Sequence, residues 1–324
     1  MPDLRPTILI AGGAGFLGSH LADAFIATHD VVIVDNLSTG RKKNIGHLLG
    51  SPQFTFIEAD IVQPLPETIT ERKFTIIANL ASPASPPGYQ KLALETLAVG
   101  SQGTFNLLEL ARANEARFFQ ASTSEVYGDP EVHPQKEDYW GHVNPYGPRS
   151  MYDEAKRYAE ALIYSYRQRY RLSTAVVRIF NTYGPRMDPA DGRVISNFIV
   201  QALKGEPLTV YGQGEQTRSF CYVSDLIAGF VKFINSNEEG PINIGNPNEF
   251  TVAQLAQTVL SLSGSQSPIS YLPLPKDDPK QRQPDIGLAK ERLGWTPTIA
   301  LNEGLKQTID YFKQELSESV AGGK

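Results

Sequence analysis

The chain has 324 residues, of which 41% are hydrophobic and 20% are charged, as is typical of a globular protein with one large or two smaller cores. Its net charge of −5 excludes a chain-wide basic field, so we expect neither nucleic acid nor a membrane surface as a partner. The single cysteine excludes an internal disulfide, and no apolar run approaches the roughly 20 residues of a membrane-spanning helix, so we expect a cytoplasmic protein.

Six apolar segments predict the strands of the first half of the chain. They are Thr7–Ile10, Val31–Val34, Phe54–Ile57, Thr75–Ala78, Arg117–Ala121 and Ala175–Phe180. Segments with helical length and composition, such as Leu17–Ala27 and Ala93–Ala113, lie between them. Uniformly apolar strands that alternate with helices predict a Rossmann-type, doubly wound α/β fold with a parallel sheet.

The pattern changes after about residue 182, where prolines and glycines cluster in Gly184–Gly192 and the elements become shorter. We therefore predict a Rossmann domain over residues 1–182 and a second, smaller α/β substrate domain over residues 183–324. The apolar run Ile242–Ile244 predicts that the chain returns to the main sheet within residues 220–245.

A glycine-rich turn follows the first predicted strand. In AGGAGFLG, Gly12, Gly15 and Gly18 allow a tight turn, a close approach to a pyrophosphate and close packing of helix on strand. Asp35 ends the second strand, where a carboxylate accepts hydrogen bonds from ribose hydroxyls and repels a 2′-phosphate. The pattern predicts NAD rather than NADP. The basic run Arg41–Lys43 could contact a phosphate or form a solvated helix start.

Tyr152 and Lys156 lie four residues apart in YDEAK, so they share one side of a predicted helix whose expected N-cap is Ser150. Positive charge from Lys156 and an oxidised nicotinamide favours a phenolate and is expected to lower the pKa of Tyr152. Tyr152 is therefore the predicted general base for an alcohol that loses hydride, a role that contributes roughly 10²–10⁴ in rate. The full set of predicted cofactor-binding residues is Gly12, Gly15, Phe16, Leu17, Gly18, Asp35, Asn36, Thr39, Asp60, Ile61, Leu80, Ala81, Tyr152 and Lys156.

Several motifs occur in a fixed order along nearly the whole chain. They are GGAGFLG, VVIVDN, NLASPAS, STSEVYG, YDEAK, RIFNTYGPRM and QTRSFCYVSD. Together they resemble the extended short-chain dehydrogenase/reductases that act on nucleotide sugars. The segments GDPEVHPQKEDYWGHVNP, DGRVISNFIVQALKGEPLTVYG and Arg282–Trp295 are most similar to the UDP-glucuronate decarboxylases within that group.

This resemblance implies an NAD-dependent reaction on UDP-glucuronate. C4 of the sugar is oxidised, CO₂ leaves the resulting β-keto acid, and the ketone is reduced again to give UDP-xylose. The resemblance also implies a homodimer formed through a four-helix bundle of the segments near Ala93–Ala113 and Ser150–Tyr170.

The resemblance assigns roles residue by residue. Thr123 and Tyr152 are expected at the C4 hydroxyl, and Lys156 is expected to orient Tyr152. The implied catalytic residues are Thr123, Glu125, Tyr152, Lys156 and Arg282. The implied substrate-binding residues are Tyr89, Thr123, Tyr152, Asn181, Arg193, Tyr211, Arg218 and Arg282. Arg282 is expected near the sugar carboxylate, while Glu125 could handle the C5 proton, position a water or shape the pocket.

Other functions of the same fold stay open at this point. A 4,6-dehydratase acting on dTDP-glucose typically carries an acid where this chain has Ser124, and serine is a poor acid for expelling hydroxide. Ala98–Gly100 replaces the Lys-Thr-Asn of many decarboxylases, which leaves a nucleotide-sugar 4-epimerase or 4,6-dehydratase as the alternative. A non-catalytic NAD-binding regulatory protein is a further alternative. The five scattered histidines have no metal-ligand spacing, so we predict no metal site.

Overall fold

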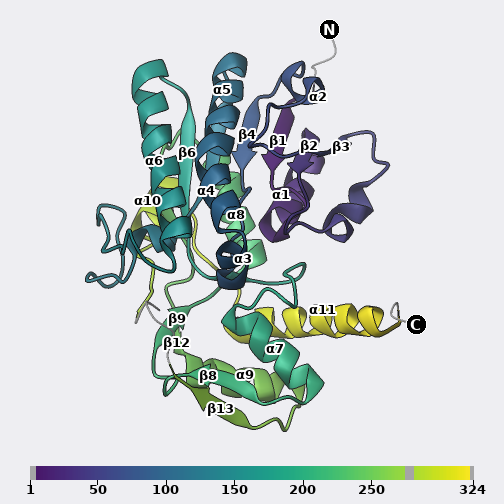
Figure 1. Cartoon of the computed structure of the whole chain (residues 1–324), viewed down its shortest axis with the longest axis vertical. Coiled ribbons are helices and arrows are strands. Elements are labelled where there is room, and N and C mark those ends of the chain that lie inside the picture. The colour runs from purple at the N-terminus through teal and green to yellow at the C-terminus, as the bar shows by residue number, and fades with distance from the viewer. Residues whose placement is uncertain (1–4, 274–280, 322–324) are drawn as a thin grey trace.

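The computed structural model describes residues 5–273 and 281–321, and its centre is a seven-stranded parallel sheet (Figure 1). The strands, in sheet order, are β11 (Ile242–Ile244), β6 (Thr174–Ile179), β5 (Arg117–Thr123), β4 (Ile76–Asn79), β1 (Thr7–Ala11), β2 (Asp30–Asp35) and β3 (Phe54–Glu58). Strand order reverses between β1 and β4, the point at which doubly wound sheets bind ligands. The predicted Rossmann-type sheet is confirmed.

The two faces of the sheet carry separate cores. Ile8 and Ile10 of β1 pack with apolar residues of α1 (Phe16–Ile26) and α8 (Val223–Ile234). Leu9, between them, points to the other face and packs with residues of α5 (Thr104–Asn114) and α6 (Ser150–Tyr170). Because alternate residues of one strand are buried on opposite sides, the strands are apolar throughout, as the sequence indicated.

The predicted helix Ala93–Ala113 is not one regular helix. It consists of α4 (Ala93–Ala98), a π-helical turn (Val99–Gly103) and α5. Gly100 of this turn lies so close to α6 that a Cβ atom would stand 2.7 Å from the Cβ of Ala155. The short helices α2 (Glu67–Thr70) and α3 (Pro86–Lys91), and the 3₁₀ helices η1 (Lys42–Leu48) and η3 (Ser124–Tyr127), complete this part.

Helix α6 begins one residue differently from the prediction. Ser150 is its first helical residue rather than its N-cap, and the Ser150 hydroxyl donates to the carbonyl of Gly147 at 2.8 Å. The N-cap is Arg149, which makes no side-chain capping bond. The Arg149 side chain does not cap the helix and instead contacts Glu125.

A smaller α/β unit lies below the sheet in Figure 1. Its paired strands are β8 (Leu208–Tyr211) with β13 (Ile269–Leu272) and β9 (Thr217–Ser219) with β12 (Glu249–Thr251), and a short pair joins β7 (Thr182–Tyr183) to β10 (Cys221–Tyr222). Its helices are α7 (Val194–Lys204), α9 (Val252–Ser263) and α11 (Leu301–Ala321).

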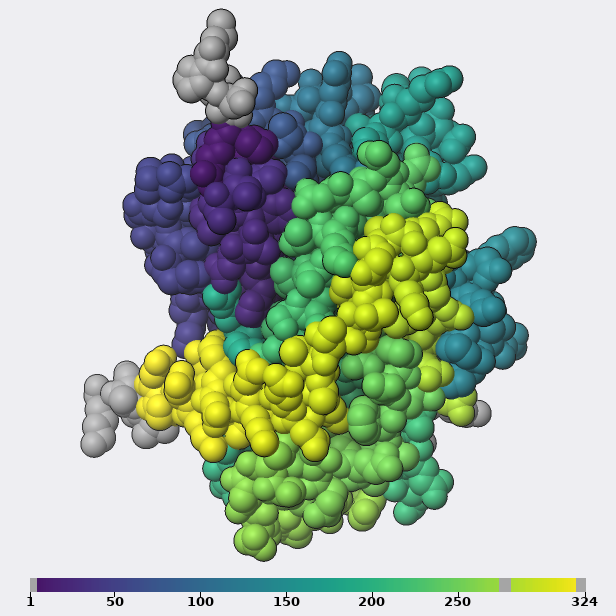
Figure 2. All heavy atoms as spheres, turned by 180° about the vertical axis from the view of Figure 1, so that it is seen from behind, coloured from purple at the N-terminus to yellow at the C-terminus, as the bar shows by residue number. Residues whose placement is uncertain are grey.

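The chain passes from the smaller unit back to the main sheet. Strand β11 pairs in parallel with β6, α8 packs on α1, and α10 (Gly287–Leu293) packs on β11. The expected return near residues 220–245 is thus present as α8 and β11. Seen from behind, the yellow C-terminal segment with α11 crosses the face between the purple N-terminal part and the light-green smaller unit (Figure 2). No described helix combines the length and apolar character needed to cross a bilayer.

Candidate active site

A cavity of about 960 Å³ lies at the carboxyl ends of the central strands and reaches the smaller unit. The residues predicted to bind cofactor or substrate, or to act in catalysis, all line it. They are Gly12, Gly15, Phe16, Leu17, Gly18, Asp35, Asn36, Thr39, Asp60, Ile61, Leu80, Ala81, Tyr89, Thr123, Glu125, Tyr152, Lys156, Asn181, Arg193, Tyr211, Arg218 and Arg282. The structure thus brings the whole predicted set together, and the role of each residue stays a prediction.

The glycine turn at one end of the cavity has the shape that a pyrophosphate needs. Gly12 has a φ of +74°, and a Cβ atom there would lie 2.7 Å from the backbone of Ala81. Gly15 is the N-cap of α1 and has no side chain that could cap the helix. The amides of the first turn of α1 therefore have no side-chain partner at the N-cap. The side chain of Asn79 accepts a hydrogen bond from the Ala81 amide at 3.2 Å and so fixes the turn that faces Gly12. These residues fit a dinucleotide.

Asp35 is fixed at the end of β2 by two backbone amides. Its oxygens accept hydrogen bonds from Ala14 at 3.0 Å and from Leu37 at 2.8 Å. Burial raises the pKa of Asp35, and these two amide bonds oppose the rise. Next along the wall, the side-chain amide of Asn36 donates to the carboxylate of Asp60 at 3.1 Å. The carboxylate of Asp35 is therefore fixed in the cavity wall, and its contact with ribose hydroxyls stays a prediction.

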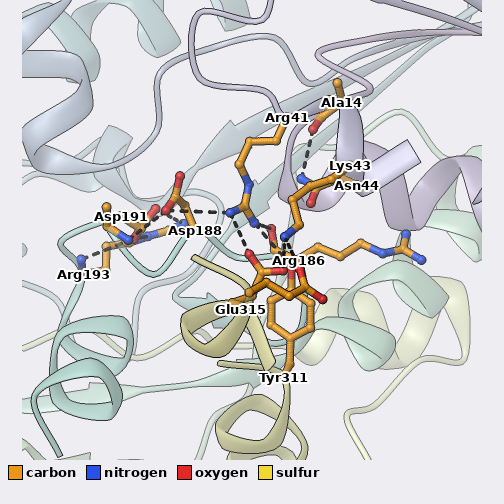
Figure 3. A network of polar contacts seen from close by, with 12 residues as sticks. Ala14, Arg41, Lys43, Asn44, Arg186, Asp188, Asp191, Arg193, Tyr311 and Glu315 are labelled. Atoms are coloured by element: carbon orange, nitrogen blue, oxygen red, sulfur yellow. Dashed lines mark hydrogen bonds and ion pairs between the residues drawn. The ribbon is translucent and has the colours of Figure 1, made fainter. Parts of the chain in front are cut away.

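Two residues of the basic run, Arg41 and Lys43, contact the C-terminal helix (Figure 3), whereas Lys42 is exposed and pairs with Glu58 of β3. Arg41 donates to Glu315 of α11 at 3.1 Å, and Lys43 lies 2.5 Å from the other oxygen of Glu315. Arg41 also lies 3.9 Å from Asp188 and donates to the hydroxyl of Tyr311 at 3.4 Å. Glu315 thus joins the segment that follows β2 to helix α11 of the smaller unit.

Thr123, Tyr152 and Lys156 meet in the middle of the cavity. A side-chain hydrogen bond joins Tyr152 to Thr123, and the ring of Tyr89 stacks on the ring of Tyr152 with 4.9 Å between centroids. Burial raises the pKa of Tyr152 to about 12, with Thr123 opposing this rise. Burial is thus the largest influence on this pKa in the protein without cofactor, and the expected lowering by Lys156 together with an oxidised nicotinamide stays a prediction.

Lys156 is held from behind by a second polar network. Its ammonium donates to the carbonyl of Ala121 at 2.9 Å, and burial lowers its pKa to about 8 while Glu160 opposes that shift. Glu160 in turn accepts two bonds from Arg178, at 3.1 and 2.7 Å, and one from Ser122 at 2.5 Å. This network was missed from the sequence because its members come from three separate elements.

Glu125 is clamped between two guanidinium groups. One oxygen accepts a hydrogen bond from Arg149 at 2.6 Å and the other pairs with Arg282. Burial disfavours the charged form of Glu125, yet the two arginines hold its pKa at about 2. Arg149, three residues before Tyr152, was not predicted as a site residue. Its position at the start of the YDEAK helix was the signal that could have indicated it.

The predicted substrate residues of the smaller unit line the far end of the cavity. Arg193, the N-cap of α7, binds Asp191 through two bonds of 2.6 and 2.9 Å. Arg218 lies on β9 and Tyr211 ends β8. Guanidinium groups placed in this way suit the anionic part of a nucleotide.

The profile of the family described as GDP-mannose 4,6 dehydratase matches residues 9–308. A UDP-glucuronic acid decarboxylase 1 of Danio rerio is 54% identical over 317 residues, covering 98% of this chain and 75% of that protein. The chain belongs to the UDP-glucuronic acid decarboxylase family, within the extended short-chain dehydrogenase/reductases of nucleotide sugars.

Solved structures of epimerases share the fold of this decarboxylase-family chain. A UDP-glucose 4-epimerase of Thermotoga maritima with UDP-glucose has a TM-score of 0.88 and 31% identity, covering 96% of this chain and 99% of that one. A UDP-glucuronic acid 4-epimerase of Bacillus cereus, in complex with UDP-glucuronic acid and NAD, has a TM-score of 0.86 and 30% identity, covering 95% and 99%. The overall fold is thus shared with the epimerases, whereas the sequence identity is higher to the decarboxylase, at 54%, than to these epimerases, at 31% and 30%.

Relative to the family pattern, Ala98 and Val99 line the cavity without a charged side chain, and Gly100 packs on α6. The cationic groups in this part of the cavity are the guanidinium groups of Arg149 and Arg282, which both contact Glu125. Among residues 5–273 and 281–321, no group of three or more His, Cys, Asp or Glu side chains is placed to hold a metal ion.

Proposed function

We propose that this chain decarboxylates UDP-glucuronate to UDP-xylose, with uptake of one proton and release of CO₂. Its relatives carry the name UDP-glucuronic acid decarboxylase. The observation that carries the proposal is that one cavity joins Thr123, Tyr152 and Lys156 to the paired cations Arg149 and Arg282. The first set suits oxidation of a sugar hydroxyl, and the second suits a sugar that bears a carboxylate. The 54% identity to a decarboxylase supports the same conclusion.

Tyr152 is the general base at the C4 hydroxyl in this proposal. Its phenol stands beside Thr123, so both side chains can bond the same hydroxyl. The glycine turn and Asp35 would hold NAD, which would supply the hydride acceptor for C4 when bound. Because burial keeps Tyr152 protonated on its own, the phenolate needs the positive charge that Lys156 and bound NAD place nearby.

Arg282 and Arg149 stabilise the negative charge during CO₂ loss. Once C4 is a ketone, the C5 carboxylate belongs to a β-keto acid, and its departure leaves an enolate. Fixed guanidinium groups stabilise such charge best where water is excluded, and Arg282 is only 3% exposed. Glu125 holds both guanidinium groups in place, and its pKa of about 2 makes it a poor proton donor for C5.

The proposed function is tested by product analysis with three sugars. The protein is incubated separately with UDP-glucuronate, UDP-glucose and GDP-mannose, and the products are separated and identified. We expect CO₂ and a UDP-pentose from UDP-glucuronate and no net change of the neutral sugars. UDP-galacturonate as the product would instead indicate an epimerase, and loss of water from a neutral sugar would indicate a dehydratase.

We also propose that two copies associate through α4, α5 and α6. Apolar side chains stand exposed along these helices, including Leu94 at 77%, Tyr164 at 58% and Phe105 at 42%. Clusters of exposed large apolar residues mark protein interfaces. In sedimentation, Leu94→Asp is expected to convert a dimer to a monomer, whereas Leu49→Asp, at another exposed leucine, leaves the dimer. A wild-type monomer would contradict the proposal.

A further inference from the structure

Asp153 is a buried carboxyl group that the proposed mechanism has not used. It follows Tyr152 directly, is 5% exposed, and its Oδ1 atom has no hydrogen-bond partner among the described residues. Its backbone amide donates to the Arg149 carbonyl at 3.2 Å, which places it one turn into α6. A carboxylate oxygen buried without a donor is costly, so the protonation state of Asp153 depends on its neighbours.

Two atoms of residues that interact electrostatically with Asp153 are also buried without a partner in the described structure. They are the hydroxyl of Tyr89 and Nε of Arg282. The guanidinium of Arg149 lies 6.0 Å from the centroid of the Tyr89 ring. Tyr89, Arg149 and Arg282 line the cavity, whereas Asp153 is not part of its wall. Asp153 thus lies outside the lining of the cavity, yet close enough for its charge to act on Tyr89, Arg149 and Arg282.

The charges that act on Asp153 come from four places in the fold: η3, the residue before α6, the residues before α10, and α6 itself. Burial and the negative charge of Glu125 raise the pKa of Asp153 to about 7, Arg149 and Arg282 oppose this rise, and Glu154 adds to it. When Asp153 is protonated, Glu125 is the one negative charge that balances the two guanidinium groups. When Asp153 is ionised, two carboxylates balance them. The cluster therefore carries one net positive charge in the first state and none in the second.

We propose that Asp153 is a positioning residue that takes up a proton when the carboxylate of the sugar binds beside Arg149 and Arg282. With Asp153 protonated, the cluster offers the incoming carboxylate its one net positive charge. With Asp153 ionised, the carboxylate meets a cluster whose positive charge is already balanced. This inference rests on the proposed function, because it requires a carboxylated sugar at this wall.

The sign of the pH effect follows from linkage. If a bound carboxylate raises the pKa of Asp153, binding consumes a proton, and affinity falls as pH rises above the pKa of the free protein. The fall approaches tenfold for each unit by which the bound carboxylate raises that pKa. A neutral sugar on the same nucleotide lacks this coupling. Lys156 titrates in the same range, so its contribution has to be subtracted.

The test is calorimetric binding of UDP-glucuronate and of UDP-glucose to the NAD-loaded protein from about pH 6 to pH 8.5, in buffers of different ionisation enthalpy that count the protons taken up. All proteins carry Tyr152→Phe so that the sugar binds without turnover. We expect proton uptake and a pH-dependent affinity with UDP-glucuronate only. Adding Asp153→Asn, which keeps the shape and Lys156, is expected to reduce both to the part that Lys156 contributes. Adding Glu154→Gln, the matched change at the neighbouring acid, is expected to keep them.

Two results would overturn the inference: no proton uptake with UDP-glucuronate, or uptake that Asp153→Asn leaves undiminished. If the Asp153→Asn protein does not fold, the proton count of the parent protein still decides. The proposed function fails separately, when the protein with Tyr152 intact binds UDP-glucuronate and releases no CO₂.

Discussion

Arg149 and Glu125 are joined by a hydrogen bond of 2.6 Å between Nη2 and Oε2 in the wall of the active-site cavity. Because Arg282 holds the other oxygen, the carboxylate stays ionised and the two guanidinium groups stay together. The arrangement turns three charged side chains into one rigid unit with a net positive charge. Removing one member therefore releases the others as well.

Arg149→Gln is expected to lower kcat with UDP-glucuronate about ten- to a hundredfold, since a charged hydrogen bond contributes roughly 1.5–3 kcal/mol. Arg149→Lys keeps the positive charge but lacks the planar guanidinium, so its kcat is expected to lie between those of the wild type and Arg149→Gln. Steady-state kinetics measures the effect. Arg169→Gln, at the exposed far end of α6, is the control and should leave kcat unchanged. An Arg149→Gln protein with wild-type kcat would exclude the cationic role.

Tyr152→Phe is expected to reduce turnover by roughly 10²–10⁴ because it removes the general base. NAD binding should persist, since the glycine turn and Asp35 lie elsewhere in the cavity. Tyr158→Phe changes the same atom at a tyrosine of α6 that is 51% exposed and should be silent. Turnover of Tyr152→Phe within a few-fold of wild type would remove Tyr152 from the mechanism.

Asp35→Ala is expected to weaken NAD binding about ten- to a hundredfold, because it removes a charged acceptor and frees the Ala14 amide. The preference for NAD over NADP should shrink, because a carboxylate no longer faces the 2′-position. Titration of each cofactor by fluorescence measures both effects. Asp30→Ala, at the opposite end of β2, serves as the control. Equal losses in the two variants would argue against a ribose contact.

Glu315→Gln is expected to destabilise the protein by about 1–2 kcal/mol, because one oxygen loses its charge-assisted bonds to Arg41 or Lys43. Burial opposes ionisation of Glu315, but Lys43, Tyr311 and Arg41 hold its pKa below the ordinary value. Its contribution is thus present at neutral pH and is lost as pH falls through the folded-state pKa. Glu318→Gln, at an exposed neighbour, should cost less in chemical denaturation; equal costs would contradict the role of Glu315.

The fold was predictable because its signals are local. Apolar strands such as Ile8–Ile10 and the positive-φ position at Gly12 each identify their structure within a few residues. The return of Ile242–Ile244 to the sheet was also readable from its apolar run. The π-helical turn at Val99–Gly103 was not predictable, because it depends on the close packing of Gly100 against α6.

The site was predictable as a set of residues but not as a network. Glu125 and Arg282 are 157 residues apart, and Arg41 and Glu315 are 274 apart, so no spacing rule links them. The raised pKa of Tyr152 depends on how deeply α6 buries its first turn, which the sequence does not state. Arg149 and Asp153 were missed for the same reason, because their importance comes from charges that other elements bring to them.

The most direct test of the account follows the carboxyl carbon of UDP-glucuronate. The protein is incubated with substrate whose carboxyl carbon is isotopically labelled, and the label is traced in the gas phase and in the nucleotide sugar. The account predicts that the label leaves as CO₂ in step with the appearance of unlabelled UDP-xylose. Label retained in a UDP-hexuronate product would contradict it.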